Sequence, residues 1–387
     1  MISSWPYYHK DEINAVSSVL SSGLVNKWFG NITHAFEREF AEYFNLKNAL
    51  TSANGTLSLE AAYTAIDFRE GEELITTPRS FIATASSAAL KGAKIRFADV
   101  DIDSGNITSN SIEPLINSKT RAITVVHLGG WPADIKNIAA LAKSYDLDLI
   151  EDCSQAHGAK FDSKFVGTFS DISTWSFCND KIISTGGEGG MISSSNPEYF
   201  QKIWSYRDHG KDKNLVENKI SNSSYQWLHK NLGSNIRMTE LQSAIGRIQL
   251  TKLENWIKKR TNNAQIFISY LSDINSVRVP LPDKNIKSAW YKFYCYVVPE
   301  ALKDGWSRDR IIQEIINSGF PAFSGSCSEL YLEKCFKDLY AIPNRRLAGA
   351  KYLGETSLMF LIHPTITNKE IHNYASVVRK VLKLALK

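Results

Sequence analysis

The sequence contains few cysteines and no long hydrophobic run. Five cysteines are spread over 387 residues, no two of them form a CxxC pair, and an odd number leaves one without a partner in any disulfide scheme. Reduced thiols in a cytoplasmic protein are therefore the simpler interpretation. No apolar run approaches the length of a membrane span, and the first residues lack the hydrophobic region of a signal peptide, so we expect a cytoplasmic location and no membrane partner.

The sequence also lacks a marked excess of charge. Its 45 basic and 40 acidic residues give a formal net charge of +5, spread along the chain except near the C-terminus. There, basic residues alternate with apolar ones, which indicates an amphipathic helix with a solvated face and argues against a nucleic-acid partner. We find neither internal repeats nor low-complexity tracts. A hydrophobic content of 43% is ordinary for a soluble globular chain, here long enough for two domains.

No recognisable metal-binding motif is present. The aspartates at positions 99, 101 and 103 resemble the beginning of a calcium loop, but the glycine and the glutamate that such a loop needs further on are absent. His127 and His157 have no third ligand at a recognisable spacing. We therefore expect no metal, and we expect these histidines to lie in the core with their hydrogen bonds satisfied.

Strand and helix patterns alternate through the first part of the chain. Such alternation is typical of a mostly parallel sheet covered by helices, with ligands at the carboxyl ends of the strands. The expected strands cover residues 74–77, 94–98, 122–127, 147–151 and 172–177, and the expected helices cover 9–20, 81–90, 111–116, 135–145 and 197–206. Phe81, His127 and Asp152 should then lie near one rim of the sheet. No GxGxxG follows the first strand, which argues against a dinucleotide-binding oxidoreductase.

A different pattern follows in the last part of the chain. The segment up to Ser224 is poor in apolar residues and is expected to be a surface loop, and a long amphipathic helix begins at about Met238. This helix should bridge to a second domain. From about Thr261 onward the sequence predicts an α+β arrangement, with a strand at 291–298, a helix at 308–316 and a final helix from Lys369.

The stretch from Thr174 to Ser193 places Lys181 between an apolar strand pattern and a cluster of glycines. A lysine at a strand end, beside glycines that let a ligand come close to the backbone, is a position where a carbonyl cofactor can be held as a Schiff base. A solvated lysine in a hairpin turn is the alternative interpretation, and it is the more frequent one when the stretch is taken alone.

Two further stretches each have a functional and a structural interpretation. Asn54, Gly55 and Thr56 open a helix, where free N–H groups and a hydroxyl form either an anion site or a plain helix cap. Asp152 ends a strand and is followed by Gln155. A carboxylate there either keeps the nitrogen of a pyridine ring protonated or caps the next helix.

Several segments, taken in order, match a known family. They are HLGGWPADI, EDCSQAHGA, SFCNDK, GGEGGM and NIRMTELQSAIG. The chain resembles the DegT/StrS family of sugar-nucleotide aminotransferases, which depend on pyridoxal 5′-phosphate and have the type I fold of the aspartate aminotransferase superfamily. The resemblance extends from about Ser22 to the C-terminus. It implies an α/β fold, with a large domain at residues 1–250 built on a mostly parallel seven-stranded sheet covered by helices, and a smaller α+β domain at residues 251–387.

The resemblance also implies roles for individual residues. Lys181 would hold the cofactor aldehyde, and Asp152 would pair with the pyridinium nitrogen. The other cofactor contacts would come from Phe81 stacked on the ring, Gln155 at the phenolic oxygen, Gly55, Thr56 and Ser176 at the phosphate, and Asn235 at the phosphate from the partner subunit. Two departures from the family pattern leave the roles of Asn54 and Cys178 open, since the phosphate turn reads SANGT and a cysteine stands where histidine is frequent.

The implied activity is amino transfer from L-glutamate, through pyridoxamine 5′-phosphate, to a nucleotide-linked keto sugar in a homodimer with shared active sites. A 4-keto-6-deoxyhexose, giving a 4-amino-4,6-dideoxy sugar for lipopolysaccharide or O-antigen biosynthesis, is the expected acceptor. Arg207, His209 and Arg237 are candidate sugar contacts, and each is equally compatible with a surface or interface charge.

Three alternatives accompany this expectation. One is amination at carbon 3 of a 3-keto sugar nucleotide. Another is a non-catalytic regulator that binds the same cofactor, although the sequence has no helix-turn-helix appendage or basic extension. Some relatives carry histidine at the Schiff-base position and perform dehydration, and the presence of Lys181 argues for transfer instead.

Overall fold

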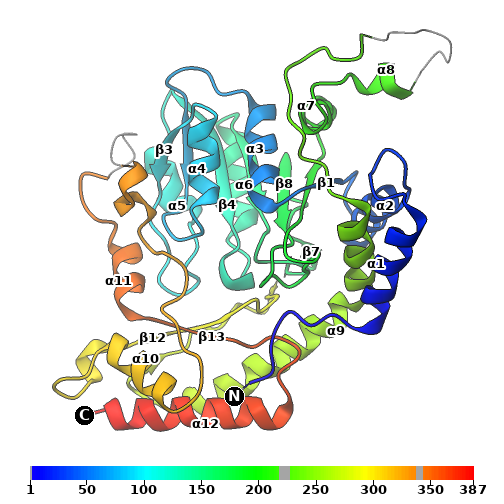
Figure 1. The fold of residues 1–387 in the computed structure, drawn as a ribbon. Coiled ribbons are helices and arrows are strands. Elements are labelled where there is room, and N and C mark those ends of the chain that lie inside the picture. Colours follow the sequence, from blue (N-terminus) through cyan, green and yellow to red (C-terminus); the bar gives the residue numbers. More distant parts are fainter. Residues whose placement is uncertain (1, 218–226, 337–342) are drawn as a thin grey trace.

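A computed structural model describes residues 2–217, 227–336 and 343–387 of the chain (Figure 1). The surface loop expected before Ser224 begins with the short helix α8 (Lys213–Glu217). The rest of that expected loop lies outside the described residues.

The large domain is built on a sheet of seven strands in the order β1-β9-β8-β5-β4-β2-β3. The strands are β1 (Leu50–Ser52), β2 (Glu73–Thr76), β3 (Lys94–Phe97), β4 (Thr120–Val126), β5 (Asp148–Asp152), β8 (Ile172–Ser176) and β9 (Gly190–Ser194). β9 is antiparallel to both of its neighbours, and the pairs from β8 through β5, β4 and β2 to β3 are parallel. The expected mostly parallel, seven-stranded sheet is therefore confirmed.

Helices cover both faces of this sheet. One face packs against α3 (Gly55–Ile66), α4 (Ala83–Leu90) and α7 (Pro197–Arg207), and the other packs against α2 (Ile32–Phe44) and α6 (Ile135–Ser144). Adjacent strand residues alternate between the two cores: Leu74 lies in the first and Ile75 in the second. This alternation follows from the two-residue period of a strand. Besides α8, the short helices of the large domain include α5 (Ser109–Ile112) and the 3₁₀ turns at 113–115 and 128–130, and the small domain has 3₁₀ turns at 299–301, 330–332 and 334–336.

The helix α9 (Glu240–Leu271) connects the two halves of the molecule, as expected. Thr239 caps it, accepting a hydrogen bond from the Gln242 N–H while the Gln242 side chain reaches back to the Thr239 N–H. Its first turns lie beside α1 (Lys10–Ser22) and α2, and its last turns contribute Phe267 and Leu271 to the core of the small domain. The predicted domain boundary at residue 250 falls inside this helix, and the division itself stays a prediction.

The small domain has a three-stranded antiparallel sheet, β10-β12-β13, covered by helices. Its elements are β10 (Val277–Arg278), β12 (Phe293–Val297), β13 (Ser357–Phe360), α10 (Arg308–Asn317), α11 (Ala348–Thr356) and α12 (Asn368–Ala385). The α12 helix is the amphipathic C-terminal helix that the sequence predicts. A second small sheet joins β11 (Ile286–Lys287) to the hairpin β6 (Lys160–Phe161) and β7 (Lys164–Phe165).

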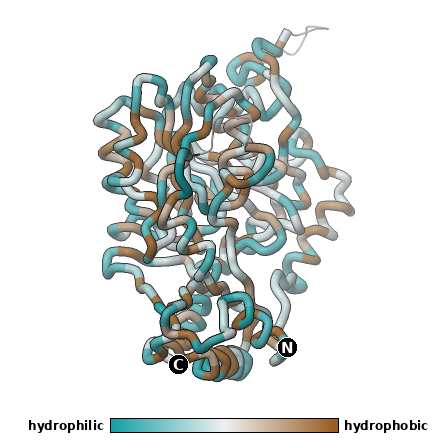
Figure 2. The backbone as a smooth tube through the Cα atoms, turned by 90° about the vertical axis from the view of Figure 1, so that its left-hand side faces the viewer, coloured by the Kyte–Doolittle hydropathy of each residue, from teal (hydrophilic) through white to brown (hydrophobic). Residues whose placement is uncertain are grey.

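Hydrophobic and hydrophilic segments alternate along the tube in Figure 2. Among the described residues, no helix is both long enough and apolar enough to cross a membrane. The hydrophobic residues described in the structure instead form four buried clusters. Three are centred on the large sheet and also take in side chains from beyond residue 250, and the fourth lies in the small domain.

Candidate active site

A cavity of about 1180 Å³ lies where the carboxyl ends of β2, β5 and β8 face the small domain. Sites at this position are expected in open α/β sheets. From the large domain, its lining includes every cofactor contact predicted for the chain's own site: Gly55, Thr56, Phe81, Asp152, Gln155, Ser176 and Lys181. The small domain contributes Tyr291, Lys292, Tyr294, Phe323, Gly325, Ser326, Cys327, Leu330, Glu333, Met359 and Leu361.

The N-terminus of α3 forms one wall of the cavity. Asn54 caps the helix, and its side chain accepts a hydrogen bond from the Leu57 N–H at 2.9 Å. The N–H groups of Gly55 and Thr56 precede the first hydrogen bonds of the helix and form its positive end. A Cβ atom at Gly55 would lie only 2.6 Å from the Cβ atom of Ser176. The helix terminus and Ser176 therefore form a tight polar cradle that only glycine permits.

Asp152 lies on the face of β5 that packs against α3 and α4. It is 4% exposed, and its carboxylate accepts hydrogen bonds from the Thr84 hydroxyl at 2.9 Å and the Ser154 N–H at 3.1 Å. Gln155 is held by the Gly129 N–H, which donates to its Oε1 at 2.8 Å. Because this bond occupies the amide oxygen, the NH₂ group of Gln155 is the donor that remains for a ligand.

Lys181 lies in the loop after β8, and its N–H donates to the Cys178 carbonyl oxygen at 3.1 Å. Its Nζ lies 4.9 Å from the centroid of the Tyr291 ring. The Tyr291 hydroxyl donates to Asp180, and Lys292 Nζ lies 3.3 Å from the same carboxylate. Desolvation raises the pKa of Asp180, but the charges of Lys181 and Lys292 outweigh this effect and bring the pKa below its usual value.

Phe81 is an aromatic side chain left open to the cavity. It is 66% exposed although it follows the buried strand β2. A large hydrophobic ring exposed inside a pocket offers a face for stacking.

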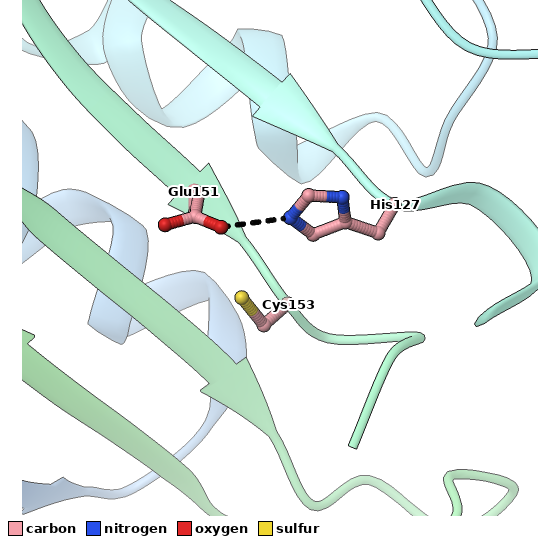
Figure 3. A group of neighbouring side chains, drawn as sticks. All are labelled: His127, Glu151 and Cys153. Carbon is pink, nitrogen blue, oxygen red and sulfur yellow. Dashed lines mark hydrogen bonds and ion pairs between the residues drawn. The ribbon is translucent and has the colours of Figure 1, made fainter. Parts of the chain in front are cut away.

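Behind Asp152, on the opposite face of β5, lie His127, Glu151 and Cys153 (Figure 3). These groups offer ligand atoms within 4.8 Å of one another, a cluster that the sequence spacing did not predict. However, the Ala133 N–H donates to His127 Nδ1 at 3.0 Å, so Nε2 carries the proton and donates to Glu151 at 3.1 Å. His127 is thus the satisfied core histidine that we expect, and it does not line the cavity with Phe81 and Asp152.

His157 departs from the expectation of a satisfied core histidine. The ring is fully buried, and among the described residues neither of its nitrogens has a hydrogen-bond partner. Burial, together with the nearby charges of Lys181 and Arg260, lowers the pKa of His157 from 6.5 to about 3. The ring therefore stays neutral beneath the loop that carries Lys181.

The three candidate sugar contacts do not line this cavity. Arg207 is buried elsewhere, where its guanidinium donates to Glu37 at 2.5 Å and to the Thr51 carbonyl oxygen at 3.3 Å. His209 is exposed, and Arg237 pairs with Asp208. Asn235, predicted to act in the partner's site, is also exposed and lies outside the cavity.

Several lining or supporting residues have no signal in the sequence. Thr84 contacts Asp152 from a position 68 residues earlier in the chain. Tyr291 and Lys292 come from the segment before β12, where the pattern predicts only a strand. Tertiary structure alone brings these side chains to Lys181 and Asp152.

Comparison with known proteins agrees with this geometry. An aminotransferase structure from Psychrobacter cryohalolentis superposes with a TM-score of 0.97 and 45% identity, covering 100% of both chains. GDP-perosamine synthase of Escherichia coli O157:H7 is 35% identical over 275 residues, which are 70% of this chain and 72% of that protein. The dTDP-4-dehydro-2,3,6-trideoxy-D-glucose 4-aminotransferase of Saccharopolyspora spinosa is 26% identical over 388 residues, covering 98% of this chain and 96% of that protein.

A family model matches nearly the whole chain, from residue 6 to residue 381. The same span holds the cradle of α3, the carboxylate on β5 and the lysine after β8. The chain therefore belongs to the DegT/DnrJ/EryC1/StrS aminotransferase family and is a pyridoxal-phosphate-dependent aminotransferase.

Proposed function

We propose that this aminotransferase moves an amino group from L-glutamate to a nucleotide-linked keto sugar, and that the acceptor is a 4-keto-6-deoxyhexose. The main support for the proposal is that Lys181, Asp152, the exposed ring of Phe81 and the N-terminus of α3 all line one cavity, in a chain of this family. Two of the proteins named above carry a nucleotide-linked sugar in their names, and one of these two is a 4-aminotransferase.

The residues of the cavity fit pyridoxal phosphate. The cradle of Gly55, Thr56 and Ser176 suits a phosphate because it combines N–H groups, hydroxyls and a positive helix end, and no side chain at residue 55 fills it. The exposed ring of Phe81 suits the face of a pyridine, and the buried carboxylate of Asp152 suits a protonated ring nitrogen. Lys181 supplies the amine that the aldehyde requires.

Pyridoxal phosphate, when bound, supplies an aldehyde that takes the amino group and a ring that spreads negative charge. We propose that the Lys181 amine acts as the general base and moves the proton from the α-carbon of the donor. Asp152, held by the Thr84 hydroxyl and the Ser154 N–H, keeps a proton on the ring nitrogen. We expect the sugar to bind against the small-domain residues that line the cavity.

Product analysis tests the proposal. We expect the protein, incubated with L-glutamate and a dTDP- or GDP-linked 4-keto-6-deoxyhexose, to give the 4-amino sugar and 2-oxoglutarate, as followed by mass spectrometry and NMR. Lys181→Ala is the matched control and should give neither product. An amino sugar formed only from a 3-keto substrate would overturn the regiochemical part, and no amino sugar from either substrate would overturn the sugar-nucleotide part.

We also propose a cytoplasmic homodimer whose active sites are shared. Apolar side chains are exposed around the segment that bears Asn235: Leu24 is 51%, Phe29 75%, Trp227 85% and Leu232 99% exposed. Lys211 Nζ lies 4.6 Å from the ring centroid of Trp28, which joins the loop around residue 28 to this segment. A hydrophobic surface of this kind is typical of a subunit interface.

Subunit mixing tests whether Asn235 acts in the partner's site. We expect Lys181→Ala and Asn235→Ala to be nearly inactive as separate homodimers. After subunit exchange, the mixed dimer contains one site with both native residues, so activity should return. If Asn235 served its own subunit, both sites of the mixed dimer would stay defective and no activity would return.

A further inference from the structure

The first residues of the chain form a segment, residues 2–9, that we call the N-terminal strap. In Figure 1 the strap begins beside α12 and runs to α1. The Thr365 hydroxyl donates to the Ser4 carbonyl oxygen at 2.7 Å, and the Ser3 hydroxyl donates to Glu370 at 3.0 Å. Ile2 packs against the hydrophobic core of the small domain. The strap is therefore anchored on the small domain.

Trp5 connects this strap to the lysine of the active site. Its indole Nε1–H donates to the carbonyl oxygen of Lys181 at 2.9 Å. The ring meets Trp256 edge to face with centroids 5.0 Å apart and stacks on His363 at 6.2 Å, and the guanidinium of Arg260 lies 5.3 Å from the ring centroid. The ring is half-buried and also lines an open pocket, but side chains from α9 and the small domain contact it from several directions and favour one direction of its N–H.

A second contact supports the same loop. The Tyr8 hydroxyl forms a hydrogen bond with the Ser184 hydroxyl at 3.0 Å, and between the two strap contacts lie the fully buried residues Ile182 and Ile183. The loop from Lys181 to Ser184 is thus held by the strap on one side and by the core on the other. The Lys181 amine, at the far end of the side chain, lies over the ring of Tyr291.

We propose that Trp5 is a positioning residue for amino transfer. Its indole N–H fixes the Lys181 carbonyl, and thereby the direction in which the Lys181 amine reaches the cofactor and the donor. Reaction rates depend steeply on such placement, since small displacements of a reacting group cost large factors in rate. Because the strap is anchored at Thr365 and Glu370, the placement of the lysine also depends on the small domain.

Trp5→Phe separates the hydrogen bond from the packing. Phenylalanine keeps an aromatic ring in the cluster and removes the donor. Trp256→Phe is the matched control, because it keeps an aromatic ring against Trp5 and leaves the Trp5 hydrogen bond to Lys181 in place. Hydrogen exchange of the amides of residues 181–185 is measured in the cofactor-free protein. In the loaded protein, the pH midpoint of the cofactor absorbance and the glutamate half-reaction are measured.

We expect Trp5→Phe to speed exchange of these amides several-fold and to shift the pH midpoint of the absorbance. The half-reaction rate constant should fall about tenfold, with the half-saturation concentration of glutamate unchanged. Trp256→Phe should stay near the wild type in amide exchange, in the pH midpoint and in the half-reaction rate constant. The last measurement rests on glutamate being the donor, as proposed above. If it is not, the wild type itself does not react, while exchange and the pH midpoint still report on Trp5.

Two results would overturn the proposal. One is a Trp5→Phe protein with wild-type exchange and wild-type pH midpoint, and the other is an equal change in Trp256→Phe, which would mean that the ring only packs. If Trp5→Phe does not fold, Thr365→Val replaces it. This variant loosens the strap and retains the indole, so it should show the same changes at smaller size, and wild-type behaviour would again count against the proposal.

Discussion

Asp152 and Glu151 are neighbours at the end of β5, but they face opposite sides of the sheet and have opposite surroundings. Glu151 is fully buried and accepts hydrogen bonds from His127, from the Gly167 and Phe169 N–H groups and from the Ser170 hydroxyl. Asp152 accepts fewer, and it lines a cavity. The same chemical group is thus committed to the fold on one face and remains available to a ligand on the other.

The largest expected effect comes from the carboxylate on the cavity side. Asp152→Asn keeps an oxygen for the Ser154 N–H, and the Thr84 hydroxyl can turn to accept from the new NH₂ group, so both contacts can persist. The charge that keeps a ring nitrogen protonated is lost, so we expect amino transfer to fall on the order of 10³-fold. The melting temperature should change little. Turnover of the loaded enzyme and a thermal melt measure the two effects. Activity within tenfold of the wild type would contradict the proposed role of Asp152.

Glu151→Gln makes the matched change on the other face and should affect stability instead. The amide NH₂ of glutamine would face the backbone N–H groups of Gly167 or Phe169, which leaves buried donors without an acceptor. We expect the free energy of unfolding to fall by about 3 kcal/mol, as measured by urea denaturation. Activity per folded molecule should remain near that of the wild type. A stable but inactive Glu151→Gln protein would break the distinction between the two faces.

The two buried histidines, His127 and His157, also differ in their surroundings, and the difference makes the stability of the fold depend on pH. His127 is satisfied by Glu151 and Ala133, whereas the buried ring of His157 lies near Lys181 and has no hydrogen-bond partner of normal geometry in the part of the chain that the structure describes. The pKa of His157 is about 3 in the folded chain and 6.5 when unperturbed. Between these pH values the unfolded state binds more protons, so stability falls as the pH falls through this window.

His157→Phe should remove the part of the pH dependence of stability that His157 causes. Between pH 7 and pH 5, protonation of His157 in the unfolded state lowers the free energy of unfolding of the wild type by about 2 kcal/mol. The variant lacks this group and should not show this decrease. His363, whose pKa burial also lowers to about 3, keeps its own contribution in both proteins. Urea denaturation at the two pH values measures the difference. An unchanged pH dependence would mean that His157 is protonated in the folded protein.

The sequence predicts the residues that line the cavity better than the polar residues buried in the interior. Lys181, Asp152 and Gly55 carry their signal locally, because each stands at the end of a strand or the start of a helix in a recognisable motif, and the cavity brings them together. The partner of Arg207, in contrast, is Glu37, 170 residues away in the chain, and nothing local indicates that this arginine is buried. In this chain the guanidinium of Arg207, one of the candidate sugar contacts, pairs with Glu37 and Thr51 in the interior.

Short strands escape prediction for a related reason. β1 has three residues and β13 has four, and each is defined by its neighbours: β1 by pairing with β9, and β13 by pairing with β12. A run this short has no measurable period of its own. The small-domain wall of the cavity, to which β13 contributes Met359 and the segment before β12 contributes Tyr291 and Lys292, is for the same reason visible only in the structure.

Phe81 gives the smallest expected effect and the sharpest distinction between a ligand-facing and a core aromatic side chain. Because its ring is 66% exposed, Phe81→Leu removes little buried area, and the free energy of unfolding should change by less than about 0.5 kcal/mol. Loss of ring stacking should weaken cofactor binding by about 1 kcal/mol, or about fivefold, as measured by equilibrium titration of the cofactor-free protein. Phe97, which is 4% exposed in the core beside α4, is the matched control. Phe97→Leu should cost stability and leave cofactor affinity unchanged. If the two variants behaved alike, the exposed ring at the rim would have no role in stacking, and the cavity would have to hold the cofactor by its polar groups alone.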